Sequence, residues 1–222
     1  MEKKDAEQAA PILRRSLDTL VSVVPAAGRN GSDLRRACGA LSANAEALIQ
    51  SDMVGPPLSN CFDLAFTCGA TDAQLAIVRN GTLAETPTLL GAMLIKNAIV
   101  RLCLGTEGAV IAGTTFTSRA DIDALQAEIN AVFAIVEETA ADDMDQAAFQ
   151  ALVALHAAII YFLVETERAV PRLVRFMFYK AMPTLVTAMR LYSDARRADE
   201  LRDENKVVHP AFMRPTGVGM AS

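Results

Sequence analysis

The sequence has no tryptophan, and aromatic residues make up only 5% of its 222 residues. Hydrophobic residues nevertheless reach 52%, so alanine and the aliphatic side chains must carry the packing, a composition that favours closely packed helices. A chain of this length can form one good-sized core, or one domain with a small appendage. We therefore expect a mainly α-helical protein.

Histidine and cysteine are also scarce. The two histidines, His156 and His209, lie far apart, and no C-x-x-C pair occurs. This spacing does not favour a zinc site. The chain also lacks the cysteine density of a disulfide scaffold, so we expect buried thiols at all four cysteines, Cys38, Cys61, Cys68 and Cys103.

Familiar catalytic motifs are missing too: there is no G-x-S-x-G elbow and no H-E-x-x-H. Residues 108–115 have the glycine spacing of a P-loop but lack its lysine, which reaches the phosphates. His156 lies in an apolar helical stretch typical of a core histidine, and the acidic pairs at 137–138 and 142–143 are typical of solvated helix ends. No helix is predicted after the glycines at 217–219, which excludes a dinucleotide loop. We expect no enzymatic activity, no cofactor and no metal.

Long uninterrupted hydrophobic runs are absent as well. The apolar stretch 89–112 contains three charged residues, and 149–164 is shorter than the roughly 20 residues that a spanning helix needs. Residues 1–8 are acidic as well as basic, with no apolar segment of a signal peptide after them. We therefore expect no membrane insertion and no secretion signal.

Apolar residues recur at steps of three and four along most of the chain, as in helices that bury one face. Pro56-Pro57 should break the chain, and the glycines of 105–113 should interrupt regular structure. Residues 118–121 have the form of a capping box at a helix start. The spacing predicts longer helices over about 9–24, 32–49, 86–104, 118–139 and 143–168, the last two packed together, and short ones over 59–67 and 71–78.

The pattern changes at Val170-Pro171. Strand-forming residues at 173–180 predict a strand, and 182–192 and 195–205 predict two short helices before an irregular tail. We expect a helical bundle over 1–169 and a small basic α/β unit over 170–222.

Charge changes sign near the same place. From Arg168 onward there are ten Lys/Arg and five Asp/Glu, whereas the preceding residues carry 11 and 21. One interpretation is a surface for DNA or an acidic partner. The other is a solvated helix face on which Arg196, Arg197 and Arg202 pair with nearby acids. The sequence leaves both open.

A longer motif lies in this basic region. Residues 189–201 read M-R-L-Y-S-D-A-R-R-A-D-E-L, and Asn205 and 209–212, H-P-A-F, follow. They resemble the terminal motif of Mu-like phage DNA circularisation proteins, R-L-Y-G-D-A-x-R-A-x-E-L, then Asn and H-P-G-F. The stretches 116–119 and 170–174 also resemble that family, so the resemblance covers about 116–215.

The motif is also similar to a degenerate LysM-like unit of phage tail and baseplate proteins, which has a strand, two helices and a closing strand. Two departures argue against glycan binding: Ser193 replaces the common glycine, and 215–220 does not match the closing strand. The mostly β module at the start of the family has no counterpart before Met1, so we expect a shorter relative or a truncated form.

The resemblance implies a structural minor tail or baseplate-hub protein, carried in the virion tail and assembled in the bacterial cytoplasm. Its expected partners are other tail or baseplate proteins and further copies of itself in a symmetric ring. The alternative is a sequence-independent DNA-end binding protein that aids circularisation of injected DNA. Apolar surface left uncovered on the monomer would indicate the first function. An affinity for DNA that falls strongly with salt would indicate the second. The candidate interface or DNA-contact residues are Arg172, Arg175, Lys180, Arg190, Arg196 and Arg197.

Overall fold

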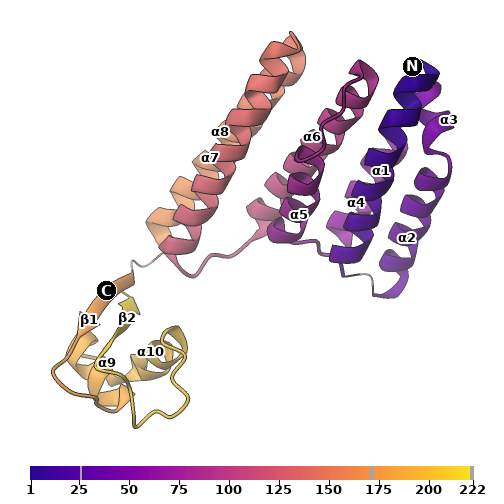
Figure 1. Cartoon of the computed structure of the whole chain (residues 1–222). Coiled ribbons are helices and arrows are strands. Elements are labelled where there is room, and N and C mark those ends of the chain that lie inside the picture. The colour runs from indigo at the N-terminus through magenta and orange to yellow at the C-terminus, as the bar shows by residue number, and fades with distance from the viewer. Residues whose placement is uncertain (26, 171–172, 221–222) are drawn as a thin grey trace. The chain divides into compact units, whose positions relative to one another are not determined.

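A computed structural model describes residues 1–25, 27–170 and 173–220. The described chain is mainly helical, as predicted, and ends in a small two-stranded antiparallel sheet with helices between its strands (Figure 1). It contains two compact units, one of residues 1–114 and 132–159 and the other of 115–131 and 160–222. The predicted boundary at 169/170 stays a prediction.

The first six helices belong to the first unit. Their bounds are α1 Lys3–Val23, α2 Gly28–Ala43, α3 Ala45–Gln50, α4 Gly55–Thr67, α5 Asp72–Leu83 and α6 Leu90–Gly113. Helix α1 packs against α2, α3, α5 and α6, and α4 packs against α2 and α6. The shared core consists mainly of alanine and aliphatic side chains, with three cysteines and little aromatic content.

Several predicted boundaries in this unit are wrong. Helix α1 begins six residues before the predicted start because Ala6 and Ala9 are already buried in the core. The predicted helix 32–49 is two helices, α2 and α3, which meet at Asn44. Pro56 and Pro57 open α4 rather than break the chain, because the first turn of a helix needs no backbone N–H from proline.

Helix α6 is the largest correction. It runs without a break through the glycines of 105–113, where the sequence predicts an interruption. A Cβ at Gly108 would lie 3.2 Å from side-chain atoms of Leu155 and Ile159, so glycine here permits close helix packing. Both Lys96 and Arg101 of α6 have partners: Lys96 Nζ donates to the Glu85 carbonyl at 2.7 Å, and Arg101 Nη1 lies 2.9 Å from Asp145 Oδ2.

Helices α7 (Arg119–Asp142) and α8 (Gln146–Ala169) form a helical hairpin and pack together, as predicted. The Phe133 and His156 rings stack with centroids 4.5 Å apart, and near the other end Arg119 Nη1 lies 3.5 Å from Glu167 Oε1. His156 is half-buried rather than a core residue. Its Nδ1 lies 3.0 Å from Glu137 Oε1, so Glu137 is not simply a solvated helix-end charge.

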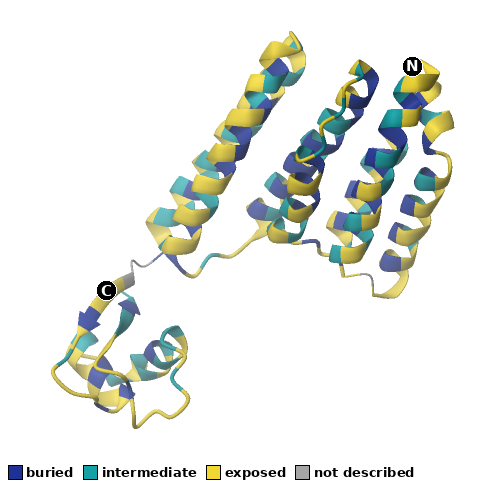
Figure 2. Ribbon diagram, in the orientation of Figure 1, coloured by how far each residue is buried: buried dark blue, intermediate teal, exposed yellow. Residues whose placement is uncertain are grey.

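Helix α8 differs from the short apolar segment that we expected. It has 24 residues and is long and apolar enough, by length and composition alone, to cross a membrane. Only 17% of its most apolar 18-residue stretch is buried, and exposed residues run along both helices of the hairpin (Figure 2).

The C-terminal elements are β1 (Leu173–Met177), α9 (Thr184–Tyr192), the 3-10 turn η1 (Ala195–Arg197), α10 (Ala198–Glu204) and β2 (Thr216–Met220). The predicted strand and two helices are confirmed. The prediction of an irregular tail is wrong over 216–220, because β2 pairs antiparallel with β1 and Phe176 lies opposite Gly217. Phe176, Ala188, Leu201 and Met213 form a small core between the sheet and the helices.

The cysteines lie in the first unit. Cys38, Cys61 and Cys103 are buried thiols, as predicted, whereas Cys68 is only half-buried. A hydrogen bond with Cys61 raises the pKa of the Cys38 thiol, and burial raises the pKa of the Cys103 thiol. Raised pKa values keep a thiol protonated and unreactive near neutral pH.

Candidate interaction site in the C-terminal unit

The closing strand β2 is held in place by one side chain of the motif. Asn205 lies just beyond α10, and its Oδ1 accepts from the Val218 N–H at 2.8 Å while its Nδ2 donates to the Val218 carbonyl at 2.7 Å. Nδ2 also donates to the Leu201 carbonyl at 2.8 Å. The Asn205 amide therefore pairs with both backbone groups of Val218, as a neighbouring strand would, and covers this part of the β2 edge.

The glycines of β2 make this close approach possible. A Cβ at Gly217 would overlap Asn205 Oδ1 and the Phe176 ring, and a Cβ at Gly219 would overlap the Tyr192 hydroxyl. These two glycines therefore have a packing role in the strand.

The motif residues around Tyr192 are also structural. The Arg197 guanidinium lies 3.8 Å from the centroid of the Tyr192 ring and forms two hydrogen bonds with Glu200, at 3.0 and 2.6 Å. The bond to Glu200 raises the pKa of Arg197, and burial raises the pKa of Tyr192. Ser193 ends α9 with φ 57°, a left-handed conformation that explains why glycine is common at this position of the motif.

The H-P-A-F segment forms a turn between α10 and β2. The Phe212 N–H donates to the His209 carbonyl at 3.0 Å, and the two rings lie 5.3 Å apart. The Pro210 carbonyl accepts from the Thr184 N–H at 2.7 Å, which ties the turn to the start of α9. Met213 then bridges to Met182. The turn thus has a fixed position on the small core.

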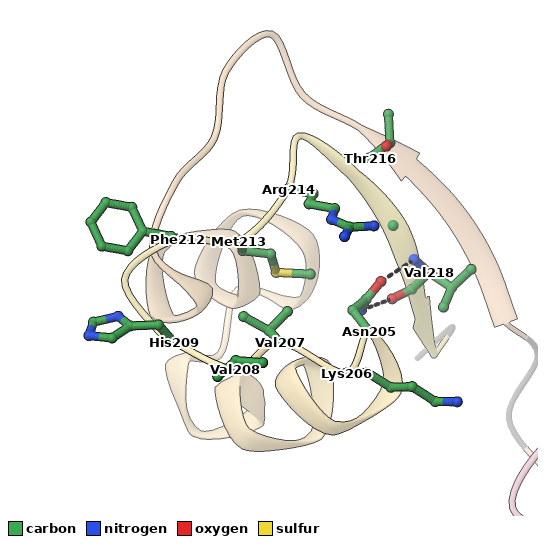
Figure 3. A pocket seen from close by; sticks show the side chains of 11 residues that line it. Asn205, Lys206, Val207, Val208, His209, Phe212, Met213, Arg214, Thr216 and Val218 are labelled. Atoms are coloured by element: carbon green, nitrogen blue, oxygen red, sulfur yellow. Dashed lines mark hydrogen bonds between the residues drawn. The ribbon is translucent and has the colours of Figure 1, made fainter.

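This turn, the end of α10 and β2 enclose a pocket of about 660 Å³ (Figure 3). Its ionisable lining residues are all bases: Lys206, His209 and Arg214. Apolar walls include Val208 and Phe212, which are 99% and 75% exposed. Pockets of about 300–1,000 Å³ commonly hold a small ligand or short segment, and this one suits an anionic group attached to an apolar one.

Five of the six residues predicted from the sequence lie elsewhere in the structure. Arg172 falls outside the described residues. Arg175 on β1, Lys180 before α9, Arg190 on α9 and Arg196 in η1 are all exposed, whereas Arg197 is held by Glu200. None of the five described residues lines the pocket. The interpretation of a paired helix face is confirmed for Arg197 and for Arg202, which lies 3.1 Å from both Asp199 and Asp203.

Sequence patterns do not single out Lys206 and Arg214, because both lie in a stretch without regular periodicity. The available signal was the excess of bases after Arg168 together with the H-P-A-F turn between them. Among the described residues, no three His, Cys, Asp or Glu side chains are grouped so that they could hold a metal ion. The chain matches no protein-family model and no curated protein.

Proposed function

We propose that the protein is a structural minor tail or baseplate-hub component of a tailed phage or prophage particle, and that it acts through protein–protein assembly rather than catalysis. On this proposal it is carried in the virion tail and is assembled in the bacterial cytoplasm. The strand–helix–helix–strand unit supports the proposal, because this is the arrangement implied by the resemblance to LysM-like tail proteins.

The observation that carries the proposal is the uncovered apolar surface of the α7–α8 hairpin. Tyr161 is 69% exposed, Ile135 53% and Val153 40%, although all three lie within long helices. One exposed hydrophobic residue is ordinary. Several large ones on a single pair of helices favour an interaction surface. We infer that another protein surface covers it in the assembled particle.

A bilayer is the other environment that could cover α8. Its hairpin partner α7 argues against insertion, because its exposed residues include five acids: Asp121, Asp123, Glu128, Glu138 and Asp142. Charged side chains in the hydrocarbon region cost several kcal/mol each, of the order of 2.5–3.5 on translocon scales. Protein partners are therefore the better interpretation.

DNA-end binding is the second candidate function. Arg175, Lys180, Arg190 and Arg196 favour it, since all four are exposed and form no ion pair within the described parts of the chain. They could contact phosphates without reading bases. They lie in four different segments, however, and the chain as a whole has a net charge of −5.

Two measurements on the full chain distinguish these functions. Light scattering gives the mass of the purified protein, and fluorescence anisotropy measures binding to linear duplex DNA at about 50 and 200 mM salt, a range over which phosphate binding collapses. We expect a defined oligomer without measurable DNA binding. A monomer that binds DNA at low salt and releases it at high salt would replace assembly with the DNA function.

A further inference from the structure

The turn between α7 and α8 presents a methionine to solvent. Met144 is 89% exposed and has φ 54°, a left-handed conformation that is uncommon for a large side chain. Glycine or asparagine usually occupies this position after a helix. An apolar side chain that is both exposed and conformationally disfavoured suggests a contact outside the chain itself.

The turn is well fixed. The N–H groups of Met144 and Asp145 donate to the Ala141 and Ala140 carbonyls at 3.0 and 3.1 Å. Asp145 Oδ1 accepts from the Ala148 N–H at 3.1 Å, and this bond, with help from Arg101, lowers the pKa of Asp145. Met144 therefore projects from a turn whose backbone is already fixed, so that mainly its side chain loses conformational entropy on binding.

Acidic side chains flank this methionine. Asp142 and Asp143 are exposed, and Asn97 donates to one oxygen of Asp143 at 3.0 Å. Asp142 is the last residue of α7, where the helix dipole disfavours an acid. The tip formed by residues 142–145, which we call the acidic tip, thus joins an apolar side chain to negative charge.

The pocket of the C-terminal unit has the opposite character. Lys206 and Arg214 form no ion pair within the described residues, and no acidic residue lines the pocket. Val208 and Phe212 supply exposed apolar walls that a methionine could cover. Charge and apolar character are therefore complementary between the acidic tip and the pocket.

We propose that the acidic tip of one copy docks into the C-terminal pocket of a second copy, with Met144 against Val208 and Phe212 and with Asp142 near Lys206 and Arg214. This inference rests on the proposed assembly function and identifies its partner as another copy of the same chain. Tip and pocket are different surfaces, so the contact is heterologous and joins copies head to tail. Repetition of such a contact builds a ring when the rotation closes.

Two variants test the contact from either side. The tip variant carries Asp142→Arg and Met144→Asn; asparagine suits the left-handed backbone, and a base suits the end of α7. The pocket variant carries Lys206→Glu and Arg214→Glu, both at exposed positions. Asp123→Arg and Lys4→Glu are controls, since they reverse exposed charges away from both surfaces. Circular dichroism checks that every variant is folded.

The readout is mass by light scattering at equal concentration. We expect an oligomer for the wild type and both controls, and the monomer mass of 23.7 kDa for the tip variant and the pocket variant alone. An equimolar mixture of the two variants should give twice the monomer mass and nothing larger. Only one productive contact is possible in it, between the intact tip of the pocket variant and the intact pocket of the tip variant.

Other results overturn the inference in distinguishable ways. If the wild type is an oligomer and both variants keep its mass, the copies meet through another surface, and the inference fails while the assembly function stands. If the wild type is a monomer without DNA binding, self-association fails and the partner is a different tail protein. If it is a monomer that binds DNA, both proposals fail.

Discussion

At the scale of single residues, Ser193 offers a direct test of the C-terminal motif. Its φ of 57° and ψ of 18° place it in the left-handed region at the end of α9. That conformation costs a non-glycine residue about 1–2 kcal/mol. Glycine avoids this cost, but it loses more conformational entropy on folding, which cancels part of the gain. We expect Ser193→Gly to raise the free energy of unfolding of the C-terminal unit by about 0.5–1 kcal/mol.

Hydrogen exchange of the amides in α9 and α10 measures this change in the full chain. Ser193→Ala is the control, because alanine keeps the conformational cost and should give no gain in protection. Equal protection in the glycine and alanine variants would show that the backbone conformation at this residue is not the source of strain.

The site was harder to predict at this scale than the fold of the unit. The sequence motif identifies Tyr192, Asn205 and the H-P-A-F turn, and the structure gives each a packing or hydrogen-bonding role. The number of basic residues identifies candidates such as Arg197. It does not show that Arg197 is already paired with Glu200 and stacked on Tyr192. Which bases line a pocket depends on how β2 folds back on α10, and local sequence does not carry that information.

At the scale of helix pairs, α5 and α6 are joined by a buried ion pair. Arg79 Nη1 lies 3.2 Å from Glu107 Oε2, and the two side chains are only 1% and 2% exposed. Removing one partner of a buried pair leaves an uncompensated charge, at a cost of about 3–5 kcal/mol. We expect Arg79→Leu alone to destabilise the first unit by that amount, and Arg79→Leu combined with Glu107→Leu to cost much less than the sum of the single changes.

Urea unfolding of the four proteins in this double-mutant cycle gives the coupling energy between the two side chains. Leu20→Ala, at a fully buried position of α1, serves as a reference for simple loss of core packing, about 2–5 kcal/mol. Strictly additive losses in the double variant would contradict the expected coupling.

Helix positions were largely predictable at this scale, whereas their limits were not. Periodicity locates the helices because buried side chains recur once per turn. It fails at Pro56 and at Gly108 for different reasons. Proline is compatible with the first turn of a helix, and Gly108 is explained by the close approach of Leu155 and Ile159, which are about 50 positions further along the chain. Strand β2 was not predicted because closely spaced glycines are typical of a loop. In the structure, Asn205 and Tyr192 occupy the space beside these glycines.

At the scale of the whole molecule, the described hydrophobic residues include two clusters without a common member. One involves α1 to α6, and the other consists of Phe176, Ala188, Leu201 and Met213. Because each cluster excludes water on its own, its stability should be largely local. Leu201 is completely buried, so Leu201→Ala should cost about 2–5 kcal/mol within the C-terminal unit.

Native-state hydrogen exchange of the full chain locates this loss. We expect amide protection to fall throughout 173–220 in Leu201→Ala while the amides of α1 to α6 keep their wild-type protection. Leu20→Ala should do the converse, because Leu20 belongs only to the first cluster. Loss of protection in both regions from either substitution would mean that the two clusters unfold as one cooperative unit. A chain with separable units can present a helical surface and a pocket to different neighbours, which is what a head-to-tail contact between copies requires.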